Sequence, residues 1–473
     1  RCALPYLFPG SDFDQVEAWS FKVTKDAEME LDSNIQGVTL QKIARGVKNR
    51  KNGQPVRFIY DEQMPRELLK KLLVQLKLSS VDATLPSGRH QNHKDLMKFP
   101  SCGHKELKYE SWPGLMKPEF LSERSVFDEI REKDRFIHVP YHSFNGYIRV
   151  LQEAALRPEV KSIKTTLYRL AKDSKVVKCL ISAARNGKKV TAVVELLARF
   201  DEESNIMWSK RMQEEGVNVI FGVEGLKIHS KLLLLETKKG NIACVGTGNF
   251  HEGNAKIYTD YLMMTARPRI VNEVAKVFDF IDRPFSQVRF RELMVSPNSM
   301  KTRIMRYLDV EIANTKAKKE AWVKIKINHI TDVDVVRKLY EASTAGVKIE
   351  ILIRGNCSLV PGVKGLSENI RCVGIIDRYL EHSRILIFAN GGNPRYFLGS
   401  ADWMPRNLNN RIEVMTPVFD ADLKKDLLRT INYGLADTTN GRIVDGKGNN
   451  SLQQGEVFRS QEQLYKAYID EQK

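Results

Sequence analysis

Between residues 126 and 280 the chain alternates short apolar runs with amphipathic stretches. Apolar runs rich in β-branched residues predict strands, and stretches that begin at Ser or Asp and end at Gly predict helices. We expect a strand at 162–170, followed by a helix that Ser174 caps and Gly187 ends. The other expected elements are strands at 189–197, 217–223, the segment of His229 and 243–246, with helices starting at Asp201 and near 270–280. Elements of these lengths in alternation indicate an α/β domain with parallel strand pairing.

The same order of elements recurs later in the chain. The expected elements are a strand at 322–327, a helix at 333–345 and strands at 347–354, 370–373, 385–388 and 396–399. The helix end in segment 183–190 matches the one in segment 342–349, and each contains a glycine before its strand. This recurrence predicts an internal duplication at the scale of a domain.

Residues 1–118 follow a different pattern. We expect short strands at 21–24 and 56–60, a helix that opens at Pro65 with one stripe of leucines, and an irregular stretch at 79–114. The composition changes near 118–125. We therefore predict three domains, namely an α+β segment at 1–118 and two related α/β domains at 119–295 and 296–473. The predicted fold class is α/β.

Charge narrows the class of partner. The chain has 75 Lys and Arg against 58 Asp and Glu, a net charge of +17. An excess spread along the chain indicates a polyanionic partner, which is a nucleic acid, an anionic membrane surface or a phosphate polymer. The six cysteines show no metal-ligand spacing, and no apolar run reaches the ~18–20 residues that span a bilayer. We expect a cytosolic protein with reduced cysteines and, because it begins at Arg1, a fragment of a longer chain.

Two segments share a histidine, a cation two residues later and a glycine seventeen residues after the histidine. They are His229, Lys231 and Gly246 in the first copy, and His382, Arg384 and Gly399 in the second. Residues two apart in a strand lie on one face, so each imidazole has a cation beside it. Such a pair suits phosphoryl transfer, because one group attacks or protonates while the other binds phosphate oxygens. Two half-sites predict one composite centre, and two purely structural histidines are the alternative.

Three arginines stand at the ends of expected strands, at Arg169, Arg199 and Arg354. Ligands collect at the carboxyl ends of strands in open α/β sheets, and a guanidinium there binds phosphate oxygens as a fork. The turns 246–249 and 399–402 offer backbone N–H groups at a fixed distance from the histidines. The sequence therefore predicts a phosphate-binding edge, and Asn249 is included in it.

The duplicated His-x-Lys strand with its downstream Gly-x-Gly-Asn resembles the phospholipase D superfamily. Longer strings resemble the polyphosphate kinase family that makes long chains, and the match runs from about Phe21 to Val418. These strings are 126–131, 140–144, 198–203, 222–231, 361–370 and 399–408. One departure is His142, where the family often has an aspartate. The resemblance further implies that an N-terminal helical domain and the start of the head domain are missing here.

The resemblance also implies a role for each candidate residue. His229 corresponds to the phosphorylated nucleophile, and His382 to a residue implicated in nucleotide binding and as an acid. Tyr258 and Arg354 correspond to nucleotide contacts, and we place Lys231, Arg384 and Asn249 beside them. Arg169 and Arg199 correspond to the magnesium site. A guanidinium cannot ligate a cation, so we interpret both as clamps on the phosphates that hold the ion.

The expected function is therefore reversible transfer of the ATP γ-phosphate to polyphosphate through a phosphohistidine, with ATP and Mg²⁺ as cofactors. The expected partners are ATP, ADP and inorganic polyphosphate but not nucleic acid. We also expect a cytoplasmic homo-oligomer with peripheral association at the inner face of the membrane.

The sequence can be compared with two alternative functions. A phospholipase D-type phosphodiesterase or nuclease expects an aspartate five residues after the cation in both copies, where this chain has Glu236 and Ala389. A non-catalytic basic scaffold for nucleic acid accounts for the charge, but it gives no reason for two matched histidines.

Overall fold

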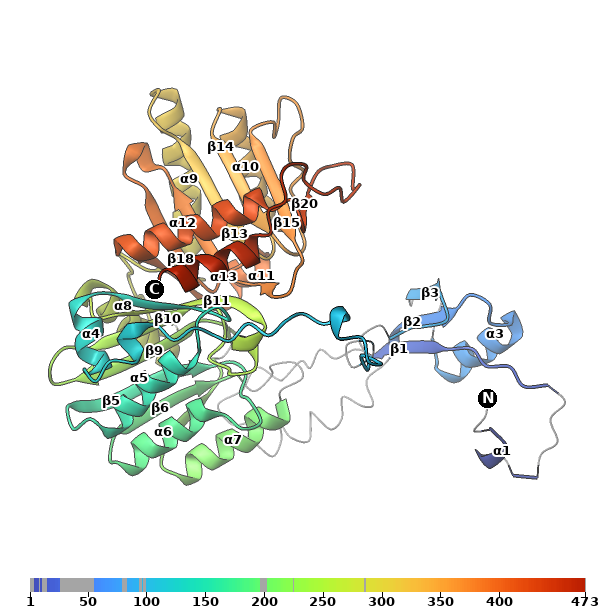
Figure 1. The fold of residues 1–473 in the computed structure, drawn as a ribbon, viewed down its shortest axis with the longest axis horizontal. Coiled ribbons are helices and arrows are strands. Elements are labelled where there is room, and N and C mark those ends of the chain that lie inside the picture. The colour runs from blue at the N-terminus through green and yellow to red at the C-terminus, as the bar shows by residue number, and fades with distance from the viewer. Residues whose placement is uncertain are drawn as a thin grey trace. The chain divides into compact units, whose positions relative to one another are not determined.

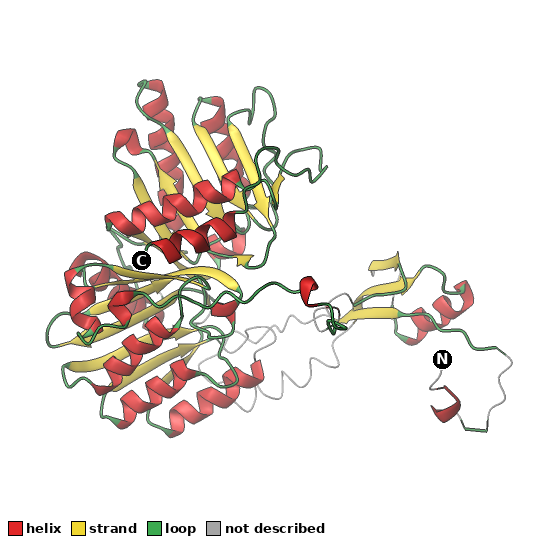
Figure 2. Cartoon of the chain, in the orientation of Figure 1, coloured by secondary structure: helices red, strands yellow, loops and turns green. Residues whose placement is uncertain are grey.

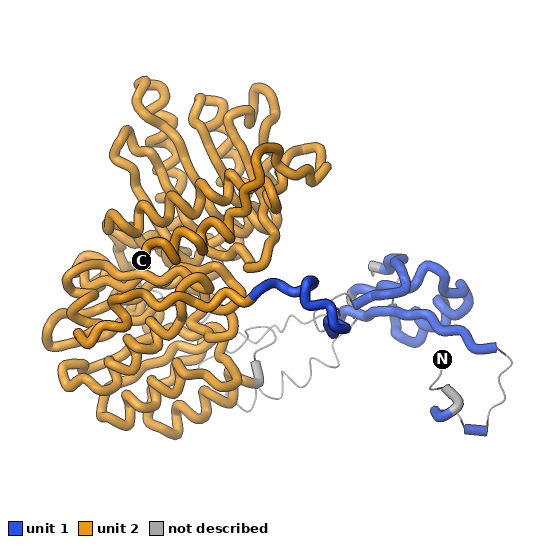
Figure 3. Tube along the Cα trace, viewed as in Figure 1, with its two compact units in different colours: residues 1–110 blue, residues 111–473 orange. Residues whose placement is uncertain are grey.

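The computed structural model describes residues 4–7, 9–10, 15–25, 55–78, 83–92, 96, 99–195, 202–223, 225–284 and 286–472. The chain divides into two compact units, residues 1–110 and 111–473 (Figure 3). None of the helices in the described residues is long and apolar enough to cross a membrane. The predicted domain boundaries at 118 and 295 remain predictions.

Unit 1 contains a three-stranded sheet of β1 (Phe21–Lys25), β2 (Pro55–Asp61) and β3 (Ala83–Ser87). β2 pairs antiparallel with β1 and parallel with β3. The helix predicted after Pro65 is α3 (Arg66–Gln75), and the described part of the unit also contains the short helices α1 (Leu4–Leu7) and η4 (Lys105–Leu107). The prediction of an irregular stretch at 79–114 was wrong at β3, where alternation over five residues is too short a signal.

The first half of unit 2 is built on one mixed sheet (Figure 1). The strands of this half are β4 (Arg135–Val139), β5 (Val160–Leu167), β6 (Lys189–Val194), β7 (Asn218–Phe221), β8 (Lys227–Ile228), β9 (Lys231–Thr237), β10 (Ile242–Gly246) and β11 (Tyr258–Thr265). Of these, β8 pairs with the sheet of the second half. Its helices are η5 (Pro118–Phe120), α4 (Val126–Glu132), α5 (Asn145–Leu156), α6 (Lys175–Arg185), α7 (Glu202–Glu214), η6 (Asn254–Lys256) and α8 (Pro268–Asp282).

The second half of unit 2 repeats this plan. Its strands are β12 (Met294–Ser296), β13 (Trp322–Ile327), β14 (Lys348–Ile353), β15 (Ile370–Ile375), β16 (Leu380–Glu381), β17 (Arg384–Phe388), β18 (Arg395–Gly399), β19 (Arg411–Val418) and β20 (Gly441–Ile443). Its helices are α9 (Met300–Lys316), α10 (Val333–Thr344), η7 (Asn390–Gly392), α11 (Pro405–Asn409), α12 (Ala421–Ala436) and α13 (Ser460–Asp470). Helices pack against the strands in both halves (Figure 2).

The sheet order confirms the predicted duplication and the α/β class. The path β11-β10-β9-β5-β6-β7 in the first half corresponds to β19-β18-β17-β13-β14-β15 in the second. Within each half the strands β5-β6-β7 and β13-β14-β15 pair parallel, whereas the strands along β9-β10-β11 and β17-β18-β19 pair antiparallel with one another. The prediction of parallel pairing was therefore right for one side of each sheet. It failed for β9-β10-β11 and β17-β18-β19, because the connections between these consecutive strands are shorter than the dozen residues that a parallel crossover needs.

The matching helix ends have a common cause. Ser174 accepts a hydrogen bond from Val177 N at the start of α6, and Asp332 accepts one from Val335 N at the start of α10. Gly187 and Gly346 then end the helices at φ of +76° and +96°. Residues with a Cβ rarely adopt this left-handed conformation, so glycine stops the helix and turns the chain into the next strand.

One hydrophobic core joins the two halves. It combines Ile270, Val274 and Phe278 of α8 with Leu423 and Leu427 of α12, all buried. α13 packs on α12 and adds an aromatic cluster that includes Tyr465 and Tyr468 (Figure 1). The two halves of unit 2 therefore form a single compact body. This body carries both histidine segments.

Candidate active site

Each histidine follows a two-residue strand that pairs with the sheet of the other half. β8, which leads into His229, pairs parallel with β19 of the second half at Arg411 and Ile412. His229 N then donates to Ile412 O at 3.0 Å. β16, which leads into His382, pairs parallel with β11 of the first half at Tyr258 and Thr259. This reciprocal exchange seats each histidine against the opposite half.

A carboxylate from the opposite half holds each imidazole. His229 Nδ1 lies 2.9 Å from both carboxylate oxygens of Glu413 in β19. His382 Nδ1 lies 2.7 Å and 2.9 Å from the oxygens of Asp260 in β11. Both acids are buried. Each also accepts a hydrogen bond from a hydroxyl of the preceding strand end, Ser400 for Glu413 and Thr247 for Asp260.

Burial keeps both imidazoles neutral. It lowers the pKa of His229 to about 3 and that of His382 to about 4, although Glu413 and Asp260 oppose these shifts. A neutral imidazole carries one proton. Because Nδ1 faces a carboxylate, that proton stays on Nδ1, and Nε2 keeps its lone pair. Both rings are therefore prepared to act through Nε2.

The two histidines differ at Nε2. Arg384 Nη1 lies 3.1 Å from His382 Nε2 and donates to the His382 carbonyl at 2.8 Å. Lys231 donates instead to the carbonyl of His229. Nε2 of His229 has no hydrogen-bond partner among the described residues, and its side chain is 13% exposed. A nucleophile needs an available lone pair, so the geometry favours His229 over His382 for that role.

Buried cations surround the pair. Burial lowers the pKa of Lys231 to about 7, against the opposing effect of Glu413. Arg384 is held by Asp402, with Nη2 3.0 Å from Oδ2. Arg354 donates from Nε to Asn328 Oδ1 at 3.1 Å, and burial together with Arg384 lowers the pKa of its guanidinium. The charge of Arg384 acts on both Lys231 and Arg354, and like charges repel one another. An anion bound among these three cations relieves that repulsion.

Aromatic rings flank the histidines. The ring centroid of Tyr258 lies 5.0 Å from that of His382, and the ring of Tyr168 lies edge-on to His229 at 5.1 Å. In the duplicated plan the position of Tyr258 is taken by Arg411 in the second half. Arg411 is among the charges that lower the pKa of His229. The duplicated plan therefore places a tyrosine on one side of the site and an arginine at the equivalent position on the other.

Comparison with known proteins identifies the family. Residues 1–99 match the polyphosphate kinase middle domain, and 125–287 and 293–463 match its C-terminal domains 1 and 2. A polyphosphate kinase of Vibrio vulnificus strain YJ016 is 44% identical over 98% of this chain and 68% of its own length. The chain belongs to the polyphosphate kinase family.

The chain is also similar to other members of the family. The polyphosphate kinase of Vibrio cholerae is 45% identical over 95% of this chain. The chain spans 65% of the length of that relative. The crystal structure of the Porphyromonas gingivalis polyphosphate kinase superposes with a TM-score of 0.85 at 35% identity, covering 99% of this chain and 69% of that one.

The structure describes two of the three remaining predicted site residues, Asn249 and Arg169. Asn249 lies after β10, with Nδ2 3.4 Å from Asn254 Oδ1, and its own Oδ1 is buried without a partner in the described part of the chain. Arg169 lies two residues beyond β5 and is half-buried. Arg199 lies outside the described residues.

The acids of this family member do not form a ready metal site. Asp260 and Glu413 hold the histidines, and Asp402 holds Arg384. No group of three or more His, Cys, Asp or Glu that could hold a metal ion occurs in the part of the chain that the structure describes. Arginines cannot ligate a cation either. The described residues therefore do not fit a protein-ligated Mg²⁺.

The sequence analysis did not identify Glu413 and Asp260 as partners of the histidines, although both acids occur at a repeated spacing. Asp260 follows His229 by 31 residues (260 − 229), and Glu413 follows His382 by 31 residues (413 − 382). Glu236, the acid at the place expected of a phosphodiesterase, accepts instead from Ser162 and pairs with Lys164 at 3.6 Å. The repeated spacing marks the orienting acids, but each serves the histidine of the other copy.

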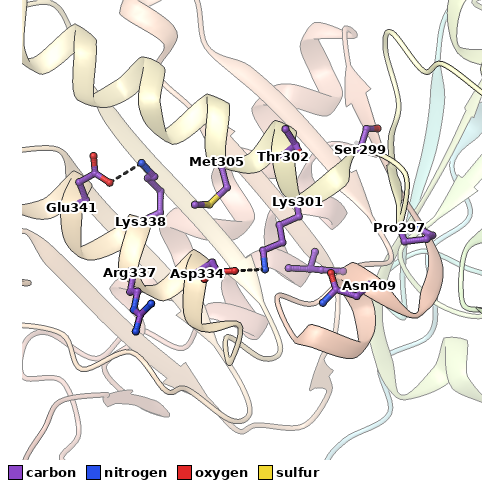
Figure 4. A pocket seen from close by; sticks show the side chains of 11 residues that line it. Pro297, Ser299, Lys301, Thr302, Met305, Asp334, Arg337, Lys338, Glu341 and Asn409 are labelled. Atoms are coloured by element: carbon purple, nitrogen blue, oxygen red, sulfur yellow. Dashed lines mark hydrogen bonds and ion pairs between the residues drawn. The ribbon is translucent and has the colours of Figure 1, made fainter.

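A groove of about 640 Å³ on α9 and α10 is a separate feature (Figure 4). Both lysines in its lining are engaged in ion pairs, Lys301 with Asp334 and Lys338 with Glu341, both at 2.7 Å. Neither histidine nor its acid lines it. The composite site between the halves is therefore the better candidate for chemistry.

Proposed function

We propose that this chain transfers the γ-phosphate of ATP to His229 and then to the end of a polyphosphate chain, reversibly. The observation that carries the proposal is the His229–Glu413 pair, which fixes the proton on Nδ1 and leaves Nε2 available. Membership of the polyphosphate kinase family supports the choice of substrates.

In the first step Nε2 of His229 attacks the γ-phosphorus, and the bond from that phosphorus to the β–γ bridging oxygen breaks. ADP leaves with the electron pair of that bond. The imidazole becomes cationic as the N–P bond forms, and the buried Glu413 carboxylate stabilises this charge. Lys231 and Arg411 neutralise the phosphoryl oxygens, which is the main electrostatic task in phosphoryl transfer.

In the second step a terminal oxygen of polyphosphate attacks the phosphohistidine, the N–P bond breaks, and neutral His229 is restored. We propose that Arg384, Arg354 and His382 bind the nucleotide phosphates, with Tyr258 against the nucleoside. An acid role for His382 requires bound phosphates to raise its pKa from about 4, because the neutral ring carries only the Nδ1 proton. The proposals for Mg²⁺, homo-oligomer, cytoplasmic location and peripheral membrane contact rest on the family resemblance.

Labelling with γ-³²P-ATP tests the proposal. We expect acid-labile, base-stable label on the wild-type chain, its transfer to added polyphosphate, and loss of both in His229→Ala. His104→Ala is the control, since His104 lies exposed in unit 1 with Nδ1 2.7 Å from Glu106 Oε1. Polymer synthesis by His229→Ala at the wild-type rate contradicts the covalent mechanism.

A further inference from the structure

The last helix of the chain reaches the segment that carries His382. Gln461, in the first turn of α13, is completely buried. Its Oε1 accepts from Tyr379 N at 2.9 Å, and its Nε2 donates to Tyr379 O at 2.9 Å and to Glu381 Oε1 at 2.7 Å. One amide side chain therefore satisfies both backbone groups of Tyr379 and one oxygen of Glu381.

Glu381, which precedes His382, is held from two further directions. Its Oε2 accepts from Thr259 Oγ1 at 3.1 Å and pairs with the buried Lys326 at 2.9 Å. Thr259 Oγ1 also lies 3.2 Å from His382 N, within hydrogen-bond reach. The position of the His382 backbone therefore depends on a small buried network, and Gln461 is the member that the C-terminal helix contributes.

α13 is itself firmly anchored. At its start, Ser460 N donates to the buried Asp437 at 2.7 Å. Further along, Tyr465 stacks on Trp112 with ring centroids 4.8 Å apart, and Tyr468 donates to Asp426 at 2.9 Å. A side chain on such a helix has little freedom, which is what positioning another group requires.

Among its described residues, the first half shows no amide side chain in the equivalent place. The residue before His229 is Ile228, which is apolar and buried in the shared core. The position of Tyr379 corresponds to Leu226, whose N–H donates to Val223 O at 3.1 Å. The side-chain contacts of Gln461 given above therefore involve the segment before His382 and not the segment before His229.

We propose that Gln461 is a positioning residue for His382 in the reaction described above, on which this inference rests. Its amide fixes Tyr379 and Glu381, so that the imidazole of His382 stays on Asp260 and beside Arg384. A carboxylate in its place keeps the volume and one acceptor but loses both donated bonds and faces the Glu381 carboxylate. Displacement of a site group by about 1 Å can cost about 10²-fold in rate.

The test compares Gln461→Glu with Gln453→Glu, each in the wild-type and His382→Ala backgrounds. Gln453 is a matched control, because its Nε2 also donates to two carbonyls of the C-terminal region, Leu435 O at 3.1 Å and Asp437 O at 2.6 Å. We expect Gln461→Glu to lower turnover about 10–100-fold in the wild-type background and less than about twofold in the His382→Ala background. Gln453→Glu should change turnover by less than about twofold in both.

Equal loss of turnover in both backgrounds, or equal effects of the two glutamate variants, overturns the positioning role. Amide hydrogen exchange gives a second readout that needs no activity. We expect faster exchange in Gln461→Glu for the peptide that spans 379–384 and unchanged exchange for the peptide that spans 227–231. Unchanged exchange at 379–384 also overturns the inference. A wild-type chain that neither labels His229 nor makes polymer contradicts the proposed function, whereas the exchange result still decides the role of Gln461.

Discussion

His229 and Glu413 lie on opposite halves of unit 2, yet Nδ1 of the imidazole is 2.9 Å from the carboxylate. The acid is completely buried and also accepts from Asn407 Nδ2 at 2.6 Å. Its orientation is therefore fixed by the second half before any substrate binds. The same relationship, with the halves reversed, holds for His382 and Asp260.

Replacement of Glu413 by Gln should slow phosphorylation of His229 by about 10²–10⁴-fold, the range seen when an orienting acid becomes an amide. The amide can donate to Nδ1, which moves the ring proton to Nε2 and removes the attacking lone pair. Single-turnover labelling with γ-³²P-ATP measures the rate. Glu236→Gln is the control and should stay within about twofold of wild type, because Glu236 contacts Ser162 and Lys164 instead. Equal rates for the two variants contradict the orienting role.

The ionisation of Lys231 should make kcat/KM for ATP depend on pH. Burial lowers its pKa to about 7, so the ammonium is charged below pH 7 and loses its charge as pH rises through 7. We expect kcat/KM for ATP to fall about tenfold between pH 6 and pH 8, because a charge-assisted phosphate contact is lost. In Lys231→Arg this fall should disappear, since the guanidinium stays charged. A profile with the same slope in both proteins contradicts this assignment.

At position 169 we expect arginine and lysine to give different turnover, because a guanidinium can bind two phosphate oxygens and an ammonium is a single compact charge. Arg169→Ala should lower turnover by about 10²-fold or more, because it removes the bidentate phosphate clamp that we propose for this residue. Arg169→Lys should recover only part of the loss, since an ammonium cannot bind two oxygens in one plane. Arg185→Ala is the control, because Arg185 is an exposed residue of α6 paired with Glu215 at 2.6 Å. Equal turnover of the Lys variant and wild type would show that only charge matters.

The +17 net charge predicts different salt dependences for the two substrates. Polyphosphate offers only repeated negative charges, so its affinity should fall steeply with salt, by analogy with counterion release from nucleic acid. The affinity for ATP should fall less steeply, because contacts of the nucleoside with Tyr258 are not screened. Binding titrations of both ligands at several salt concentrations give the two slopes. Parallel slopes count against an extended basic path for the polymer.

The residues that carry the chemistry could be found because their spacing repeats within the sequence. The single strand expected to carry each histidine with its cation was wrong, because β8 ends at Ile228 and β9 begins at Lys231, and β16 and β17 leave the same gap at His382. The acids could not be assigned in the same way, because Glu413 serves the histidine 184 residues earlier. No local pattern indicates which half supplies the partner.

The fold was predictable where local signals decide it. Caps and glycine stops set α6 and α10, and their positions agree with the expected ones. β8 and β16 are each two residues long and exist only because the other half supplies a paired strand. A pattern of apolar and polar residues cannot predict an element whose hydrogen bonds all lead to a distant segment.

The reciprocal exchange of β8 and β16 couples the two histidine segments to each other. Each pair of histidine and acid crosses the boundary between the halves, so a movement of one half against the other changes the His229–Glu413 and His382–Asp260 distances at the same time. A ligand that shifts the halves is therefore expected to affect the tautomers of both imidazoles, and with them both proposed steps.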